Sequence, residues 1–293
     1  VTTMATLWHT VAVRDVFLLE RQMERLSRLP SEYTFLNYLR CHDDIGWGLE
    51  YAALRERGME EIPHKKYLND YFTGVYPGSD ARGELYNDDP SLGDARLCGT
   101  TASLCGLEAA AGRGDRAAVQ RAIRCDQMLH GFIFTLSGIP MLYSGDEIGQ
   151  LNDSRYRDDP RLAADSRYVH RGPFCWEAAA RRQEQGTAQQ ALFDWIGRLE
   201  NIRRENPVFA AGARICPRGT QDSSVLCLVR ERGDRRLIAW FHFSPEPVTV
   251  LAGEEGAFID LLAPEEGTIR ETVTLPGYGM RWLVPEEREE RKG

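Results

Sequence analysis

The chain has 293 residues, of which 42% are hydrophobic and 27% are charged, so it is long and apolar enough to form a packed core. Its formal net charge is −8, with 36 basic against 44 acidic residues and no long basic run, which argues against a nucleic-acid partner. No stretch approaches the roughly 18 apolar residues of a membrane-spanning helix, so no membrane partner is expected either.

Seven cysteines are scattered along the chain without C-x-x-C spacing. Their odd number and their spacing argue against a zinc site and against a complete disulfide framework. We therefore expect reduced thiols, no metal and no cofactor. The first 20 residues show no export signal, which favours a cytoplasmic location over secretion. The chain begins at Val1 and runs at once into a helical pattern, which favours a fragment over a complete protein.

The predicted elements begin with a helix, because apolar residues recur at helical spacing between positions 7 and 18. Residues 34–41, TFLNYLRC, have the length and composition of a strand, and they end in the polar turn HDD at 42–44. Residues 51–97 are rich in Gly, Asp, Pro and Tyr, and they predict a long, ordered loop with a functional role.

Helical patterns return at 100–111 and 115–131. Residues 138–143, GIPMLY, predict a second short buried strand that ends in another polar turn, SGDE, at 144–147. Short buried strands that alternate with helices, with polar groups at the strand carboxyl ends, are typical of a parallel (β/α) barrel. Such a barrel needs eight strands, and two are visible.

An amphipathic helix is predicted at 187–205, and beyond it the apolar period changes from that of a helix to that of short strands. These strands are expected at 224–229, 237–243, 248–251, 258–262 and 280–284. The expected architecture is α/β plus all-β: the carboxy-terminal portion of a (β/α)8 TIM barrel at 1–210, followed by an antiparallel β-sandwich domain at 211–293.

The sharpest local signal is RCHDDIGW at 40–47, where polar groups and an aromatic ring follow a strand. Taken alone, the Asp-Asp turn is also typical of a solvated bend or a helix cap. HDDIGW, followed by GIPMLYSGDEIGQLND at 138–153, resembles the carboxy-terminal half of amylosucrases and related sucrose-active members of the α-amylase superfamily. LWHTVAVRDVFLLE, GDARLCGTTASLCGL, DSRYVHR and the β domain extend this resemblance over nearly the whole chain.

The resemblance implies retaining glycosyl transfer, in which one carboxylate attacks the anomeric carbon, a second protonates the leaving oxygen and a third steadies the distorted sugar. By its place in the motif, Asp43 looks like that third carboxylate. His42 would bond the glucosyl hydroxyls of the first subsite, and Asp44 would reach toward the fructosyl ring. Arg167 matches the family's arginine at the first subsite, and Arg96 matches one on the fructosyl side. Each arginine taken alone is more typical of a surface ion pair.

No counterpart of the nucleophile or of the general acid is found, so the chain alone is expected to be inactive. The substrate would be sucrose or an α-glucan, by transfer or by hydrolysis, and the implied partner is the missing amino-terminal half of the barrel. Sucrose phosphorylase and α-glucosidase are the alternatives within the class. A non-catalytic carbohydrate-binding or interaction protein is the alternative outside it.

Two further sets of residues can each be interpreted in two ways. Asp146 and Glu147 follow the last barrel strand, where the resemblance implies a supporting role and where helix capping is the alternative. The aromatic residues of the 51–97 segment either offer stacking surfaces to a sugar or fill the core. They are Tyr67, Tyr71, Phe72, Tyr76 and Tyr86.

Overall fold

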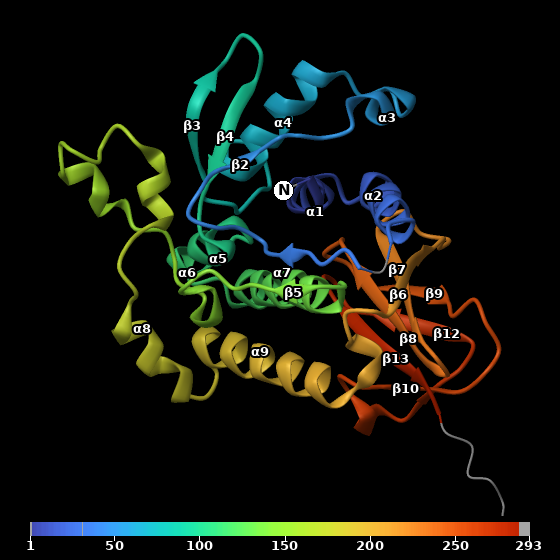
Figure 1. The fold of residues 1–293 in the computed structure, drawn as a ribbon. Coiled ribbons are helices and arrows are strands. Elements are labelled where there is room, and N and C mark those ends of the chain that lie inside the picture. The colour runs from blue at the N-terminus through green and yellow to red at the C-terminus, as the bar shows by residue number, and fades with distance from the viewer. Residues whose placement is uncertain (1, 31, 287–293) are drawn as a thin grey trace, which may run out of the picture.

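The computed structural model describes residues 2–30 and 32–286. Figure 1 shows a mostly helical part that packs against an antiparallel sheet. That sheet has six strands, in the order β11-β10-β13-β8-β7-β6, whose bounds are given below. Within the described residues, no helix has both the length and the apolar character needed to cross a bilayer. Each of the seven cysteines, all of them described, is a free thiol.

The amino-terminal helical pattern forms two helices, α1 at Thr2–Val13 and α2 at Phe17–Ser27, so the expected single helix is wrong. The break has a local cause, because Arg14 adopts the left-handed conformation with φ of 57°. Asp15 then accepts a hydrogen bond from the backbone N–H of Phe17 at 2.9 Å, which satisfies a donor at the start of α2.

The two predicted barrel strands pair in parallel, but they are much shorter than expected: β1 spans Leu36–Asn37 and β5 spans Ile139–Pro140. Pairing ends after β1 because the next backbone groups have other partners. The Leu39 carbonyl accepts a hydrogen bond from the indole Nε1 of Trp8 at 2.8 Å. The side chains that follow β1 form the polar corner described below.

Gly138 precedes β5 with φ of +104°, and a Cβ atom there would lie 2.2 Å from the backbone oxygen of Phe35. We expect Gly138→Ala to lower the free energy of unfolding by about 1–3 kcal/mol, because it adds backbone strain and a clash with a backbone atom. Urea unfolding measures this change. Gly197→Ala within helix α9 at Ala188–Glu205 is the matched control, since a Cβ there meets no atom within 4 Å and alanine favours a helix. Equal stability of the two variants would contradict the prediction.

The segment 51–97 is not the expected long loop. It forms helices α3 at Tyr51–Glu56 and α4 at Glu61–Thr73, and strands β3 at Glu84–Asp89 and β4 at Asp94–Cys98. These two strands make a three-stranded sheet with β2 at Ile45–Gly46, which precedes the segment. Its aromatic residues explain the error, because several of them build a core instead of a loop. Trp47 stacks on the fully buried Phe72 at 5.7 Å between ring centroids, and its Nε1 donates to Asn69 Oδ1 at 2.8 Å.

The other predicted helices are confirmed. The 100–111 pattern forms α5 at Thr101–Leu104 and α6 at Leu107–Arg113, separated by Gly106. The later patterns form α7 at Arg116–Thr135 and α9 at Ala188–Glu205, and the short α8 spans Trp176–Ala180. Turns of 3-10 helix occur at Asp146–Ile148, Ser154–Asp158, Ser166–His170, Arg181–Gln183, Pro207–Phe209 and Pro264–Glu266.

The antiparallel sheets of residues 214–285 contain the predicted strands and three that the sequence pattern missed. The predicted ones are β7 at Val225–Arg232, β8 at Arg235–His242, β9 at Val248–Leu251, β10 at Phe258–Asp260 and β13 at Met280–Pro285. The additional ones are β6 at Arg214–Arg218, β11 at Thr268–Ile269 and β12 at Thr272–Leu275. Strands β9 and β12 pair as a separate two-stranded sheet.

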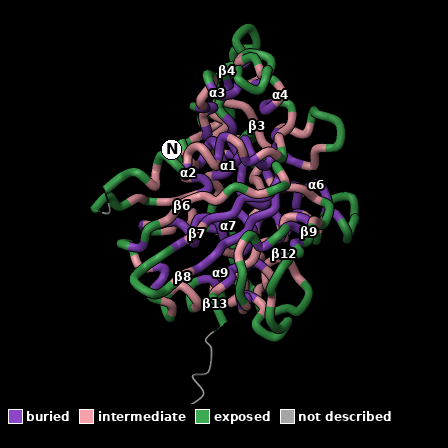
Figure 2. Tube along the Cα trace, turned by 90° about the vertical axis from the view of Figure 1, so that its right-hand side faces the viewer, coloured by how far each residue is buried: buried purple, intermediate pink, exposed green. Residues whose placement is uncertain are grey.

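Alternate residues of the six-stranded sheet enter two cores. Leu226, Leu228 and Phe241 belong to the large core shared with the helices, whereas Cys227 and Trp240 face the β9–β12 pair. Figure 2 shows that buried residues concentrate along α7 and the strands beside it. The sheet therefore supports the helical part through one face.

Two side chains of the sheet bond directly to the end of α7. Trp282 Nε1 donates to Thr135 Oγ1 at 2.7 Å, and the Nη1 of the fully buried Arg230 donates to the Thr135 carbonyl at 2.5 Å. Arg230 also donates to the carbonyls of Val208 and Ala210, both at 3.0 Å. Burial lowers the pKa of Arg230 to about 9, which leaves it cationic at neutral pH and matched by carbonyl oxygens.

Candidate functional site

A buried ion pair joins the two polar turns that follow β1 and β5. The Nε and Nη2 atoms of Arg40 both lie 2.8 Å from Asp146 Oδ1, and the two side chains are 2% and 3% exposed. The guanidinium also lies over the ring of Tyr143 at 4.5 Å. Glu147 has a local role, because its Oε2 accepts from the Gly145 N–H at 2.8 Å. Asp146 thus anchors the residue from which the HDD turn begins.

His42 and Asp43 lie at the surface above this anchor, with side chains 68% and 56% exposed. His42 Nε2 is 3.4 Å from Asp43 Oδ2. Arg171 holds both residues, because its Nε donates to the His42 carbonyl at 2.6 Å and its Nη2 lies 3.5 Å from Asp43 Oδ1. Asp43 is therefore an accessible carboxylate with a fixed cationic neighbour.

His170 supports the same turn from below. The Gly99 N–H donates to its Nδ1 at 3.0 Å, so that nitrogen carries no proton and Nε2–H donates to the His42 carbonyl at 3.3 Å. Burial first, and the charge of Arg40 second, lower the pKa of His170 to about 4. A neutral imidazole thus positions the His42 backbone.

Arg167 reaches Asp43 only through other residues. Its Nε and Nη2 donate to the two carboxylate oxygens of Asp165 at 2.8 and 2.7 Å, and its guanidinium covers the Tyr86 ring at 4.5 Å. Asp165 Oδ2 is also 4.0 Å from Arg171 Nη1. The hydrogen bonds from Arg167 hold the pKa of Asp165 below its usual range. The chain of charges runs from Asp43 through Arg171 and Asp165 to Arg167.

Asp44 and Arg96 form a second, looser pair, with Arg96 Nε 3.9 Å from Asp44 Oδ2. Strand β2 pairs Gly46 with Arg96 of β4, and a Cβ at position 46 would lie 2.0 Å from Arg96 Nη1. The absence of a side chain at Gly46 therefore lets Arg96 cross toward Asp44. Asp44 is mostly buried, with 17% of its side chain exposed, whereas Arg96 is 51% exposed.

Three residues of this network were not predicted as site residues: Asp165, His170 and Arg171. All three lie in DSRYVHR at 165–171, the segment from which only Arg167 was selected. The feature of the sequence that could have identified them is the presence of one acidic and three basic residues within these seven positions. Which of those groups meets the HDD turn depends on a contact between segments far apart in the sequence.

Cys41, His42 and Asp43 also place sulfur, nitrogen and oxygen atoms within 4.8 Å of one another, a spacing that suits a metal ion. Two observations oppose a cation at this position. The guanidinium of Arg171 already lies beside Asp43, and Cys41 Sγ accepts from the Asp43 N–H at 3.4 Å. We assign no metal to this group.

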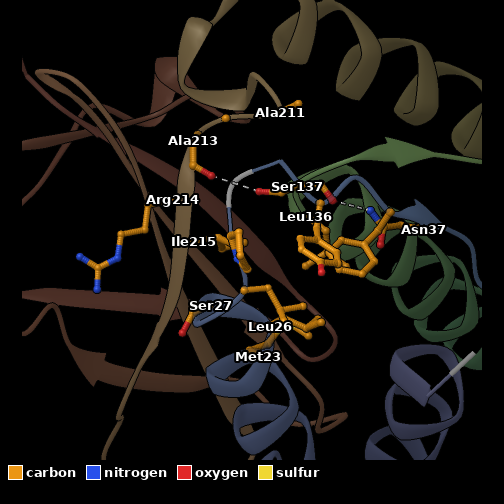
Figure 3. Close-up of a pocket in the computed structure, with 15 residues that line it drawn as sticks. Met23, Leu26, Ser27, Asn37, Leu136, Ser137, Ala211, Ala213, Arg214 and Ile215 are labelled. Carbon is orange, nitrogen blue, oxygen red and sulfur yellow. Dashed lines mark hydrogen bonds between the residues drawn. The ribbon is translucent and has the colours of Figure 1, made fainter.

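A cavity of about 310 Å³ lies at the opposite ends of β1 and β5 (Figure 3). Met23, Leu26 and Leu136 contribute much of its wall. Asn37 Nδ2 donates to the Ser137 carbonyl at 2.8 Å beside it. None of the predicted site residues lines it, so its position separates it from the HDD turn.

No protein-family model matches the sequence. Among solved structures, the chain is similar to the α-amylase from H. orenii, with a TM-score of 0.52 and 15% identity over 97% of this chain and 48% of that one. It is also similar to the cyclic α-maltosyl-(1→6)-maltose hydrolase from Arthrobacter globiformis, with a TM-score of 0.52 and 20% identity over 96% of this chain and 43% of that one. This chain spans less than half the length of either protein. At these identities the likeness concerns the fold alone.

Proposed function

We propose that the chain forms the part of a retaining α-glucoside-active enzyme that carries the transition-state-stabilising carboxylate, Asp43. The observation that carries this proposal is the position of Asp43, which follows one of two parallel strands and is held by Arg171 next to an exposed His42. In this interpretation β1 and β5 are neighbouring strands of a (β/α)8 barrel within residues 1–210, and residues 211–293 form its accessory β domain.

The chemistry follows from the charge at this position. An oxocarbenium-like transition state gains from a fixed negative charge and from hydrogen bonds to the sugar hydroxyls that strengthen as positive charge develops. Asp43 would supply the charge, and His42 would bond the glucosyl hydroxyls. Arg171 fixes the geometry of both residues before the sugar arrives, through contacts at 2.6 and 3.5 Å.

The substrate class that we propose is an α-glucoside. Sucrose is favoured by the HDDIGW and GIPMLYSGDEIGQLND motifs, with Asp44 and Arg96 on the fructosyl side and Arg167 near the glucosyl ring. An α-glucan is favoured by the Arthrobacter hydrolase, whose structure contains cyclic α-maltosyl-(1→6)-maltose. The nucleophile and the general acid would come from the rest of the barrel, so this chain alone would not turn over either sugar.

A test of this proposal needs a readout at Asp43 itself, and the neighbouring thiol of Cys41 provides one. We expect sucrose or maltotriose to slow alkylation of Cys41 by iodoacetamide, about ten-fold at ten times the dissociation constant, as followed by peptide mass spectrometry. Asp43→Asn removes the charged acceptor and should weaken this protection by about ten-fold or more in dissociation constant.

The matched control is Asp234→Asn, an exposed aspartate in the turn between β7 and β8, which should leave the protection of Cys41 unchanged. Cys175, which is exposed at the start of α8, should react at one rate under all conditions. Equal protection of Cys41 in the Asp43→Asn and unmodified proteins would refute the role of Asp43. Release of glucose or fructose from sucrose by the 293-residue chain would refute its dependence on the rest of a barrel.

A further inference from the structure

A second cavity, of about 390 Å³, lies at the junction of the helices and the sheet. It is bounded by the ends of α1 and α4, the turn between α5 and α6, one side of α7, and the loops at 245–246 and 278. Its volume falls in the range of small-molecule sites. None of the residues of the Asp43 network lines it, so it is a separate feature.

The wall of this cavity carries donors and acceptors of both charges. Arg14 and Arg121 contribute guanidinium groups, and Glu246 contributes a carboxylate from the sheet side. Asp80 contributes a second carboxylate, which is paired with Arg113 at 2.8 Å. The lining is therefore polar, but it has no strong excess of one charge.

Two tyrosines line the same space, Tyr71 from α4 and Tyr278 from the loop before β13. The guanidinium of Arg14 lies close to Tyr71, where its charge opposes the rise in the pKa of that hydroxyl caused by burial. Tyr278 is half-buried, and within the described residues no hydrogen bond joins its hydroxyl to another side chain or to the backbone. Burial raises the pKa of both tyrosines, so both remain protonated hydroxyl groups at neutral pH.

The backbone holds two of these side chains in a costly conformation. Arg14 and Tyr278 have φ of 57° and 53°, and the other non-glycine residue with positive φ in the described chain is Asn87. Such residues cost about 1–3 kcal/mol each, and they concentrate at ligand sites. Next to Tyr278, the backbone of Gly277 passes so close to Pro245 that a Cβ would lie 1.8 Å from its carbonyl oxygen. The loop is thus fixed with its tyrosine at the cavity.

We propose that this cavity is a binding site for a neutral sugar of mono- or disaccharide size, separate from the site at Asp43. The two arginines disfavour a cation, the carboxylate of Glu246 disfavours an anion, and the polar lining disfavours an apolar molecule. A sugar hydroxyl both donates and accepts, so it satisfies guanidinium, carboxylate and phenol groups together. The free hydroxyl of Tyr278 is the group that this ligand would engage.

Cys105 lines the cavity and reports on its occupancy. Burial raises the pKa of this thiol, so alkylation by iodoacetamide is followed over hours at alkaline pH. We expect maltose or sucrose to slow the modification of Cys105 about ten-fold at ten times the dissociation constant, while exposed Cys175 is unaffected. In the Asp43→Asn protein the protection of Cys105 should persist even though that of Cys41 is lost.

Tyr278→Phe removes one hydroxyl and keeps the ring and the backbone conformation, and it should weaken sugar binding about ten-fold. Arg121→Gln tests a second wall of the cavity and should act in the same direction. Tyr33→Phe, at a tyrosine that is 59% exposed away from the cavity, is the matched control. Thermal melting verifies that each variant is folded.

Titration calorimetry on the Asp43→Asn protein gives a second measurement that does not depend on thiol reactivity. Binding of maltose or sucrose that is lost on adding Tyr278→Phe or Arg121→Gln supports the site. Absence of sugar binding to the folded Asp43→Asn protein overturns it, as does equal affinity in the cavity variants. Stronger protection of Cys105 by inorganic phosphate than by maltose overturns the assignment to a neutral sugar. Protection of Cys41 is measured separately from protection of Cys105. The proposal for the Asp43 site and the proposal for the cavity can therefore be contradicted independently.

Discussion

The free energy of unfolding is expected to fall by several kcal/mol between pH 6.5 and pH 4, because two histidines are buried as neutral imidazoles. Only 2% of His9 is exposed, and its Nε2 lies 2.9 Å from His64 Nε2. Burial first, and the charge of His64 second, lower the pKa of His9 to about 3, while that of His170 is lowered to about 4.

The sign follows from proton uptake. Below the unfolded pKa of about 6.5, the unfolded chain binds protons that the folded chain excludes. The contribution to stability is thus complete above pH 6.5 and is lost as the pH falls toward the folded values. At about 1.4 kcal/mol per pKa unit, each histidine accounts for a loss of roughly 3 kcal/mol by pH 4.

Urea unfolding at a series of pH values measures this slope. His9→Gln and His170→Gln should each flatten it, since each removes one titrating group whose pKa is lowered on folding. His42→Gln is the control for the substitution itself, because that side chain is 68% exposed. Slopes in His9→Gln and His170→Gln that equal the slope of the unmodified chain would show that the two imidazoles are not held neutral by the fold.

Asp146→Ala is expected to destabilise the chain by about 3–5 kcal/mol, because it leaves the guanidinium of Arg40 buried without its counter-ion. Only 2% of the Arg40 side chain is exposed, so water cannot replace the carboxylate without a structural change. Replacing both members, as Arg40→Met with Asp146→Leu, should cost less than the single change, because no charge remains buried.

Denaturant unfolding distinguishes these cases. Asp159→Ala is the matched control, since Asp159 holds Arg161 at the same short range of 2.7 Å, but the arginine is 86% exposed. Loss of that surface ion pair should lower the free energy of unfolding by less than about 1 kcal/mol. If Asp146→Ala cost no more than Asp159→Ala, the pair beneath the HDD turn would not be an anchor.

The spacing of apolar residues in the sequence was sufficient to predict the helices and strands that bury one continuous face. The helix predicted at 187–205 is α9 at Ala188–Glu205, with Thr187 accepting from the Gln190 N–H as its cap. The strand at 248–251 was predicted with its observed bounds. In these segments the local sequence pattern and the tertiary packing favour the same element, so its bounds could be predicted from the sequence alone.

The spacing of apolar residues did not predict features that depend on a contact with a residue far away in the sequence. Strand β1 ends early because Trp8 takes the Leu39 carbonyl, and no property of residues 34–41 indicates that contact. The contact of Arg171 with Asp43 has the same origin, because it needs the 166–170 turn to lie under the HDD turn. The composition of residues 51–97 favoured a loop, but their aromatic side chains meet as a core only once α4 packs on Trp47.

The bonds from Trp282 and Arg230 to the end of α7 make the sheet a foundation for the rest of the molecule. The helix that they hold also contains Asp126 and His130, a fully buried pair at 2.7 Å whose charge acts on the Arg40 and Asp146 anchor. Removal of the carboxy-terminal strands would therefore take away the surface on which α7 rests. Conversely, substitutions that stiffen those strands offer a way to rigidify the HDD turn without altering its own residues.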